Sequence, residues 1–149
     1  MNNIIIRKAK EADLTALENL ISELIDSMGT REGIDLSMAI KNCRKFINDN
    51  NSYLAVAEKN RDIIGFINFT MRQTVLHYGG SGLIDELVVG GNYRGKGIGK
   101  MLMNFAIEKC KELGCCEVEV STESTNTKAR EFYKSYGFEE TGIILEKDL

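Results

Sequence analysis

The spacing of apolar and polar residues divides the chain into alternating strands and helices. Short apolar or alternating runs predict strands at residues 4–6, 53–57, 63–69, 83–89, 117–121 and 143–145. Turn chemistry separates neighbouring runs: Asn60–Asp62 follows the second strand, and Gly79–Gly82 breaks the third strand from the fourth.

Apolar residues three and four positions apart predict helices at residues 14–28, 36–47, 97–113 and 126–136. The residues expected to face inward are Leu14, Leu17, Ile21, Leu24 and Met28 in the first helix, Met38, Ile40, Cys43 and Phe46 or Ile47 in the second, and Ile98, Leu102, Phe105, Ala106 and Leu113 in the third. Gly114 and Gly137 stand where the last two helices should end.

This order of elements predicts an α/β or α+β domain with a mixed sheet and helices on both faces. The chain has 149 residues, no proline, and neither a repeat nor a low-complexity linker. We therefore expect residues 1–149 to form a single domain.

Composition narrows the functional classes. A net charge of −3 argues against a general nucleic-acid binder. No apolar run approaches the ~20 residues that span a bilayer, and the start lacks the pattern of a signal peptide, so a cytoplasmic location is expected. The 4 cysteines form no C-x-x-C pair and there is 1 histidine, so we expect reduced thiols and no metal site.

A glycine-rich loop lies between the fourth predicted strand and the third predicted helix. It consists of Arg94, Gly95, Lys96, Gly97, Ile98, Gly99 and Lys100. Glycine lets a backbone approach a ligand closely, and a helix start offers unpaired N–H groups to an anion, so the loop predicts a pyrophosphate site. A P-loop is excluded because it would need glycine at Arg94 and Ser or Thr at Met101, and the dinucleotide pattern Gly-x-Gly-x-x-Gly fits neither possible start.

The loop has the pattern Arg-x-x-Gly-x-Gly, which resembles the acyl-CoA-binding loop of the GNAT superfamily of N-acetyltransferases. A second stretch resembles the family pattern Asn-x-x-Ala-x-x-Phe-Tyr-x-x-x-Gly-Phe, with matches at Asn126, Ala129, Phe132, Tyr133, Gly137 and Phe138. Gly91 departs from the family, since many members have proline before the loop. Taken by itself, the second stretch also fits a plain amphipathic helix.

The resemblance implies a mostly antiparallel mixed sheet that splays between strands four and five, where the pantetheine arm of acetyl-CoA lies. The implied cofactor-binding residues are Leu87, Val88 and Val89 along the strand, with backbone groups of Leu87 and Val89 facing the pantetheine, and the amides of Gly95, Lys96, Gly97, Ile98, Gly99 and Lys100 around the pyrophosphate. Arg94 either contacts phosphate or is an exposed turn residue. Asn126 either faces the pantetheine or caps a helix.

Acetyl transfer to an amine needs a proton acceptor, because alkyl ammonium groups have pKa values near ~10. Glu86 is the first candidate, since it interrupts an apolar strand where a charge is costly without a role. Asp85 and Glu119 are alternatives. Asp85 should point to the opposite face by alternation. Glu119 lies on the neighbouring strand, where the resemblance implies that amino-terminal acetyltransferases of the family can place a base. A salt-bridge role for Glu86 also fits the sequence.

The remaining chemistry is implied by the resemblance. A backbone N–H near Val89 would stabilise the oxyanion. Tyr133 would protonate the departing CoA thiolate, and a core aromatic is its alternative. No acyl-enzyme is implied, so the cysteines need no catalytic role.

The expected function is N-acetylation of a primary amine of a small molecule by direct attack in a ternary complex. The segments 83–89, 119–122 and 145–149 look like those of aminoalkylphosphonate and aminoglycoside acetyltransferases. Alternatives are a protein amino-terminal or lysine acetyltransferase, and a non-catalytic CoA-binding module. The segment 29–36, with Arg31, Glu32 and Asp35, is a candidate for shaping the acceptor site. His77 is a second candidate, as an acceptor contact or as a metal ligand of the kind found in some phosphonate-directed relatives. A homodimer is one state open to the chain.

Overall fold

Five strands form one mixed sheet in the order β1-β2-β3-β4-β5 in the computed structural model, which describes residues 3–29 and 33–149. The strands are β1 (Ile4–Lys8), β2 (Ser52–Lys59), β3 (Asp62–Arg72), β4 (Gly80–Val89) and β5 (Cys115–Val120). Neighbouring strands run antiparallel except β4 and β5, which run parallel. The mixed, mostly antiparallel sheet expected from the sequence is confirmed.

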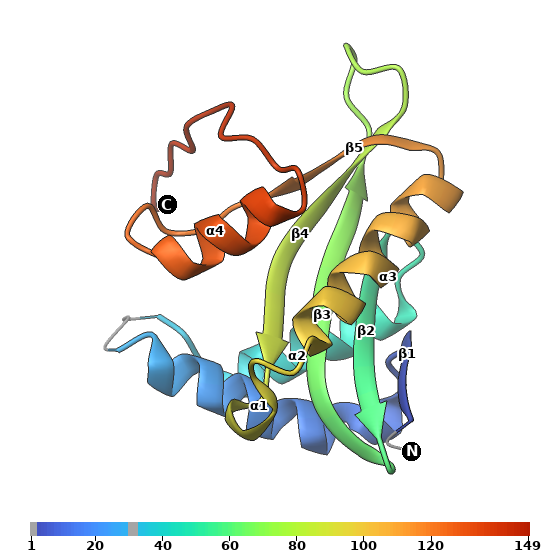
Figure 1. Ribbon diagram of the computed structural model, residues 1–149, viewed down its shortest axis with the longest axis vertical. Coiled ribbons are helices and arrows are strands. Elements are labelled where there is room, and N and C mark those ends of the chain that lie inside the picture. The colour runs from blue at the N-terminus through green and yellow to red at the C-terminus, as the bar shows by residue number, and fades with distance from the viewer. Residues whose placement is uncertain (1–2, 30–32) are drawn as a thin grey trace.

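Helices pack on both faces of this sheet. They are α1 (Leu14–Ser27), α2 (Leu36–Asn48), α3 (Ile98–Glu112) and α4 (Thr127–Ser135), with short 3₁₀ turns at Glu11–Asp13 and Gly91–Tyr93. α1 and α2 bury one core that includes Leu17, Leu54 and Phe66. On the opposite face, α3 buries a second core that includes Phe69 and Leu102 (Figure 1). Every helix in the described ranges is too short or too polar to traverse a lipid bilayer.

The parallel pairing of β4 with β5 stops halfway along β4. The paired positions run from Gly80 and Cys115 to Ile84 and Val120. From Glu86 onward β4 pairs only with β3, and Figure 1 shows β5 leading away toward α4. The expected splay between strands four and five is therefore confirmed, and it exposes one backbone edge of β4.

A β-bulge interrupts the pairing of β3 and β4 at the point where the splay begins. Asn68 lies opposite Glu86 and Phe69 lies opposite Ile84, so Asp85 is an extra residue. Ile84 can therefore pack with α3 while Val88 packs with α1 and α2. The simple alternation expected for Asp85 and Glu86 omits this bulge, which breaks the period-two pattern.

Two expectations about strands are wrong. Ile143 and Leu145 are 89% and 91% exposed and belong to no strand, because β5 pairs only with β4 in the described part of the chain. The break expected at Gly79–Gly82 is also misplaced. Gly80 begins β4, and Gly82 lies within it, where a Cβ atom would collide with the Cys110 sulfur of α3.

Three residues expected to face inward are exposed instead: Met28 (40%), Met38 (51%) and Leu113 (47%). Met28 and Leu113 occupy the C-caps of α1 and α3, and Met38 lies in the first turn of α2. Helical periodicity does not predict where a helix outruns the sheet that it covers.

Candidate active site

The glycine-rich loop forms an open cradle at the start of α3. Gly95 and Gly97 adopt φ of 75° and 80°, in the left-handed region that favours glycine. The first N–H groups of α3 have no acceptor within the helix, because the carbonyl four residues earlier lies outside it. Backbone conformation therefore selects glycine here, because no neighbour lies within 4 Å of a Cβ placed at Gly95 or Gly97.

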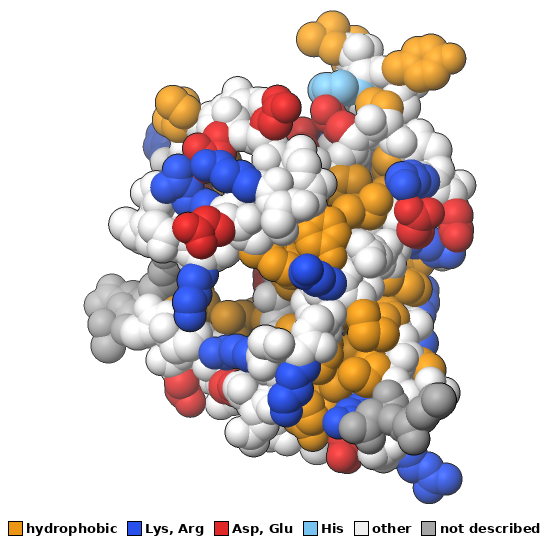
Figure 2. Space-filling model, viewed as in Figure 1, with side chains coloured by type: hydrophobic (Ala, Val, Ile, Leu, Met, Phe, Trp, Pro, Cys, Tyr) orange, Lys and Arg blue, Asp and Glu red, His pale blue; other side chains and the backbone are white. Residues whose placement is uncertain are grey.

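A cavity of about 390 Å³ opens in front of this cradle. Its lining consists of Val89, Tyr93, Arg94, Gly95, Gly97, Ile98, Gly99, Lys100 and Phe132. Figure 2 shows a passage through this side of the molecule, between the part that carries α4 and the part that carries α1, with Lys and Arg side chains around it. Unpaired amides, positive charge and free space fit the pyrophosphate and pantetheine of acetyl-CoA.

Arg94 is held by groups on both sides of the cradle. Its Nε donates to the Val89 carbonyl at 3.0 Å, and its guanidinium lies 3.6 Å from the Glu23 carboxylate of α1. The same carboxylate accepts a hydrogen bond from the Gly91 amide at 2.7 Å. Arg94 thus ties the loop to β4 and α1, and contact with phosphate stays a prediction.

The exposed edge of β4 directs the backbone of Val89 toward the splay. The N–H of the next residue, Gly90, donates to the Ile64 carbonyl of β3 at 2.9 Å. Because consecutive residues of an extended chain present their N–H groups to opposite sides, the N–H of Val89 faces away from β3. This is the side on which β5 has separated.

Glu86 lies beside this edge, with its carboxylate held by β3. Oε2 accepts a hydrogen bond from Nδ2 of Asn68 at 2.8 Å. The Glu86 side chain reaches solvent, but neighbouring protein partly desolvates its carboxylate. This desolvation is the main cause that raises the pKa of Glu86, and the nearby charge of Asp85 raises it further against the opposing hydrogen bond from Asn68. Burial also raises the pKa of Asp85. A carboxylate with a raised pKa is a stronger base at neutral pH.

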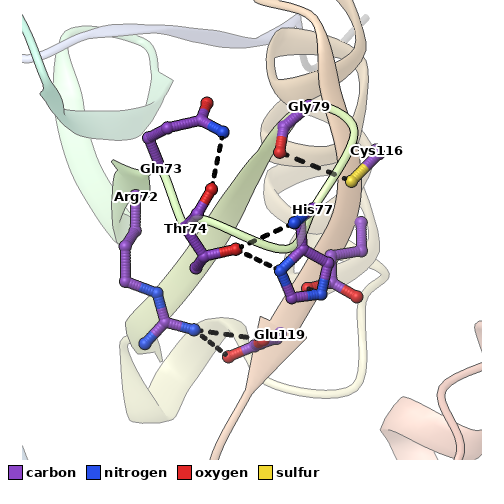
Figure 3. A network of polar contacts seen from close by, with 8 residues as sticks. Arg72, Gln73, Thr74, His77, Gly79, Cys116 and Glu119 are labelled. Atoms are coloured by element: carbon purple, nitrogen blue, oxygen red, sulfur yellow. Dashed lines mark hydrogen bonds and ion pairs between the residues drawn. The ribbon is translucent and has the colours of Figure 1, made fainter.

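Glu119 is paired with a cation. Its carboxylate lies 3.2 Å from the guanidinium of Arg72 on β3, and both side chains are about half exposed (Figure 3). The register places Glu119 opposite Leu83, on the paired half of β4 rather than along the splay. This position makes Glu119 a weaker candidate for the base than Glu86.

His77 fastens the loop between β3 and β4 to β5. Its ring contacts the hydroxyl of Thr74 through Nδ1, and its Nε2 lies 3.1 Å from the Glu117 carboxylate. The Cys116 thiol donates to the Gly79 carbonyl nearby at 3.6 Å (Figure 3). Within residues 3–29 and 33–149, no group of three His, Cys, Asp or Glu side chains is arranged to hold a metal ion. Of the other candidates for the acceptor site, Arg31 and Glu32 lie outside the described residues, and Asp35 caps α2 by accepting a hydrogen bond from the Ser37 amide at 2.8 Å.

Tyr133 lies on α4 next to Phe132, which lines the cavity. Its ring makes edge contacts with Phe132 and Phe138, at centroid distances of 5.5 and 5.9 Å. Burial raises the pKa of the phenol above its ordinary value, so the hydroxyl is protonated at neutral pH like that of any tyrosine. No described residue hydrogen-bonds to that hydroxyl, and its role as the acid stays a prediction.

Asn126 caps α4, since its Oδ1 accepts a hydrogen bond from the Ala129 amide at 3.1 Å. Two contacts absent from the sequence analysis also shape the site: the Tyr136 hydroxyl donates to the Lys100 carbonyl at 3.1 Å, and Asn68 holds Glu86. Asn68 carried the same signal as Glu86, a polar residue inside an apolar strand. Tyr136 gave no signal, because a helical aromatic residue fits the core equally well.

Comparison with known families matches residues 17–138 to the model of the Acetyltransferase (GNAT) family. The chain belongs to this family. It is an acetyl-CoA-dependent N-acetyltransferase, and the resemblance stated from its two motifs is confirmed.

Individual relatives cover almost the whole GNAT chain. It is 28% identical over 148 residues to the aminoalkylphosphonate N-acetyltransferase of Salmonella typhimurium, covering 97% of this chain and 90% of that protein. Among solved structures, a transcriptional regulator from Bacillus halodurans superposes with a TM-score of 0.86 at 24% identity, covering 99% and 100% of the two chains. An aminoglycoside N-acetyltransferase in complex with CoA superposes with a TM-score of 0.85 at 18% identity, covering 100% and 96%. These two structures support the fold.

Proposed function

We propose that residues 1–149 form one domain that acetylates a primary amine of a small molecule by direct attack on acetyl-CoA in a ternary complex. The observation that carries the proposal is the Glu86 carboxylate, whose pKa is raised and which lies beside the exposed edge of β4. The names of the relatives, which act on an aminoalkylphosphonate and on aminoglycosides, favour a small acceptor.

In this proposal the glycine-rich loop and the gap between β4 and β5 bind different parts of acetyl-CoA. Amides from Gly95 to Lys100 bind the pyrophosphate at the start of α3. The strand edge formed by Leu87, Val88 and Val89 faces the pantetheine arm, with Leu87 and Val89 offering their backbone groups. Arg94, already beside this edge, adds positive charge. Asn126, whose Oδ1 caps α4, faces the pantetheine arm from the start of that helix.

Each proton then has a defined path. Glu86 accepts a proton from the acceptor's ammonium, directly or through water, and the neutral amine attacks the thioester carbonyl. The N–H of Val89 stabilises the oxyanion that forms. As the C–S bond breaks, Tyr133 donates its proton to the CoA thiolate, and the amine gives up its second proton to solvent.

The test is acetyl-CoA turnover with a panel of small amines, followed by Glu86→Gln and Glu119→Gln on the best acceptor. Glu86→Gln keeps the shape of the side chain and removes its basicity, so the rate should fall about 10²-fold or more at neutral pH. The rate should recover partly at high pH, where the amine is already deprotonated. Glu119→Gln should have the smaller effect, because Glu119 is paired with Arg72.

The reverse ranking would move the base to Glu119 and shift the acceptor toward a peptide amino terminus. CoA binding without turnover of any amine or peptide would instead identify a non-catalytic CoA-binding module.

A further inference from the structure

Asn68 occupies a position in the sheet where packing alone does not explain a polar residue. It is 3% exposed and lies in β3 opposite Leu54 of β2, on the face that α1 and α2 cover. The core on that face is built from apolar side chains such as Leu54, Phe66 and Val88. An amide in such surroundings destabilises the fold unless its polar atoms are paired.

Only one end of the Asn68 amide has a partner. Nδ2 donates to Oε2 of Glu86, whereas Oδ1 is buried and accepts no hydrogen bond from any residue that the structure describes. A buried acceptor without a partner destabilises the folded state. An asparagine kept purely for the fold would have both ends paired, so the contact with Glu86 is the feature that accounts for its presence.

The charges around Glu86 show what this contact does. Asp85 is adjacent on β4, and the thiol of Cys43 on α2 lies nearby. Burial raises the pKa of Cys43 to about 11, and the charge of Glu86 contributes to the rise. Three effects act on the ionisation of Glu86. Desolvation and the charge of Asp85 oppose it, and the hydrogen bond from Asn68 favours it. No cation in the described part of the chain forms an ion pair with Glu86. The second carboxylate oxygen, Oε1, is left without a hydrogen bond from those residues.

We propose that Asn68 is a positioning residue that fixes one oxygen of Glu86 and keeps the carboxylate ionised, leaving the other oxygen for the acceptor's ammonium. This inference rests on the proposed role of Glu86 as the base. Asn68 touches neither substrate, and it acts through the orientation and protonation of Glu86.

The decisive experiment is the pH dependence of kcat/KM for the wild type, Asn68→Leu and Asn68→Asp. The acid limb of this profile reports the base in the free enzyme. Asn68→Leu removes a hydrogen bond to a charged group and should move the acid limb upward by about one pH unit, with activity recovering above it. Asn68→Asp should move it further, because two adjacent carboxylates resist ionising together. Thr70→Val, on the same strand but without contact to Glu86, should leave the limb in place.

A second measurement needs no turnover. Carbon-13 NMR titration of the glutamate carboxyls, with the Glu86 signal assigned from its loss in Glu86→Gln, should show the same upward movement in Asn68→Leu. The melting temperature of Asn68→Leu should stay level or rise, since an unpaired buried oxygen is removed. An unmoved titration of Glu86 in folded Asn68→Leu would overturn the inference. A lower melting temperature with an unmoved acid limb would assign Asn68 to the fold instead.

The two proposals fail in different ways. Full activity of Glu86→Gln would remove the base from Glu86, whatever the Asn68 variants do. A large loss in Glu86→Gln together with a wild-type pH profile in Asn68→Leu would leave the proposed function standing and refute the role of Asn68.

Discussion

At the scale of single residues, the cradle at the start of α3 depends on a backbone that other residues adopt with strain. Gly97, at φ 80°, is the N-cap of α3, and nothing lies within 4 Å of where its Cβ would be. Gly97→Ala therefore tests strain alone, of about 1–2 kcal/mol. Gly97→Glu adds a carboxylate where the pyrophosphate is proposed to bind.

We expect Gly97→Glu to weaken CoA binding at least about tenfold beyond Gly97→Ala, because like charges repel at the positive end of the helix. Isothermal titration calorimetry with CoA measures both variants, and circular dichroism verifies that they are folded. Equal affinities of the two variants would place the pyrophosphate elsewhere.

Removing the hydroxyl of Tyr133 tests the role of this residue. Tyr133→Phe keeps the ring contacts with Phe132 and Phe138 and removes only the proton donor. We expect kcat to fall by roughly 10²–10⁴-fold with little change in CoA affinity, because the lost interaction exists only in the transition state. Tyr53→Phe, whose ring stacks on Phe69, is the matched control. A kcat within about twofold of the wild type would leave Tyr133 with a packing role.

At the scale of elements, Arg7 joins β1 to the start of α1 and to β2. It forms ion pairs with Asp13, the residue before α1, at 2.7 Å, and with Glu58 of β2 at 2.6 Å. Burial of Asp13 acts to raise its pKa, but the hydrogen bonds from Arg7 and the Lys10 amide outweigh it and lower the pKa. A lowered pKa means that this carboxylate stabilises the fold above its unfolded pKa, and that the stabilisation is lost as pH falls through the native pKa.

Asp13→Asn should therefore reduce the free energy of unfolding by about 2 kcal/mol at pH 7, because it breaks a largely buried pair. Urea denaturation at neutral and acidic pH should show the difference from wild type shrinking as the pH falls. Glu11→Gln, which breaks the exposed pair with Arg44, should change stability by less than about 0.5 kcal/mol. A pH-independent effect of Asp13→Asn would contradict the charge argument.

Elements were predictable from sequence where one local pattern decides them. Strands such as 63–69 and the helix that begins near Gly97 follow from apolar periodicity and turn residues. The bulge at Asp85 was not predictable, because it depends on how β4 meets the neighbouring strand. Gly82 was mistaken for a break because the close approach of Cys110 is a tertiary contact.

The candidate site likewise has parts that the sequence predicts and parts that it does not. The glycine cradle and Tyr133 were found from motifs, since backbone conformation and spacing leave a trace in the sequence. The pairing of Glu119 with Arg72 and of Glu86 with Asn68 left none, because each joins residues that are distant in the chain.

At the scale of the whole molecule, the C-terminal part of the chain leaves one strand edge unpaired and several apolar side chains exposed. The outer edge of β5 pairs with no other strand in the described ranges, and Ile143, Ile144 and Leu145 are 89%, 63% and 91% exposed. An open strand edge with apolar side chains available to it favours association. A second copy of the chain supplies a segment able to cover the edge.

We expect a homodimer, with about twice the chain mass of 16.7 kDa, in size-exclusion chromatography with light scattering. Ile144→Lys should shift the equilibrium toward monomer. Val75→Lys, in the fully exposed loop between β3 and β4, is the matched control and should not. A wild-type monomer at micromolar concentration would rule this association out.

The partial pairing of β4 with β5 also determines at what stage of synthesis the candidate site can form. β1 to β4 pair in sequence order, and β2, β3 and β4 follow one another without an intervening helix, so antiparallel contacts can assemble these strands progressively as the chain emerges. β5 joins only after α3 has crossed over, because a parallel strand needs a long connection. A nascent chain that ends before Cys115 has the glycine-rich loop but lacks the gap between β4 and β5. In the proposed binding mode, acetyl-CoA therefore stabilises the fold only after β5 has paired.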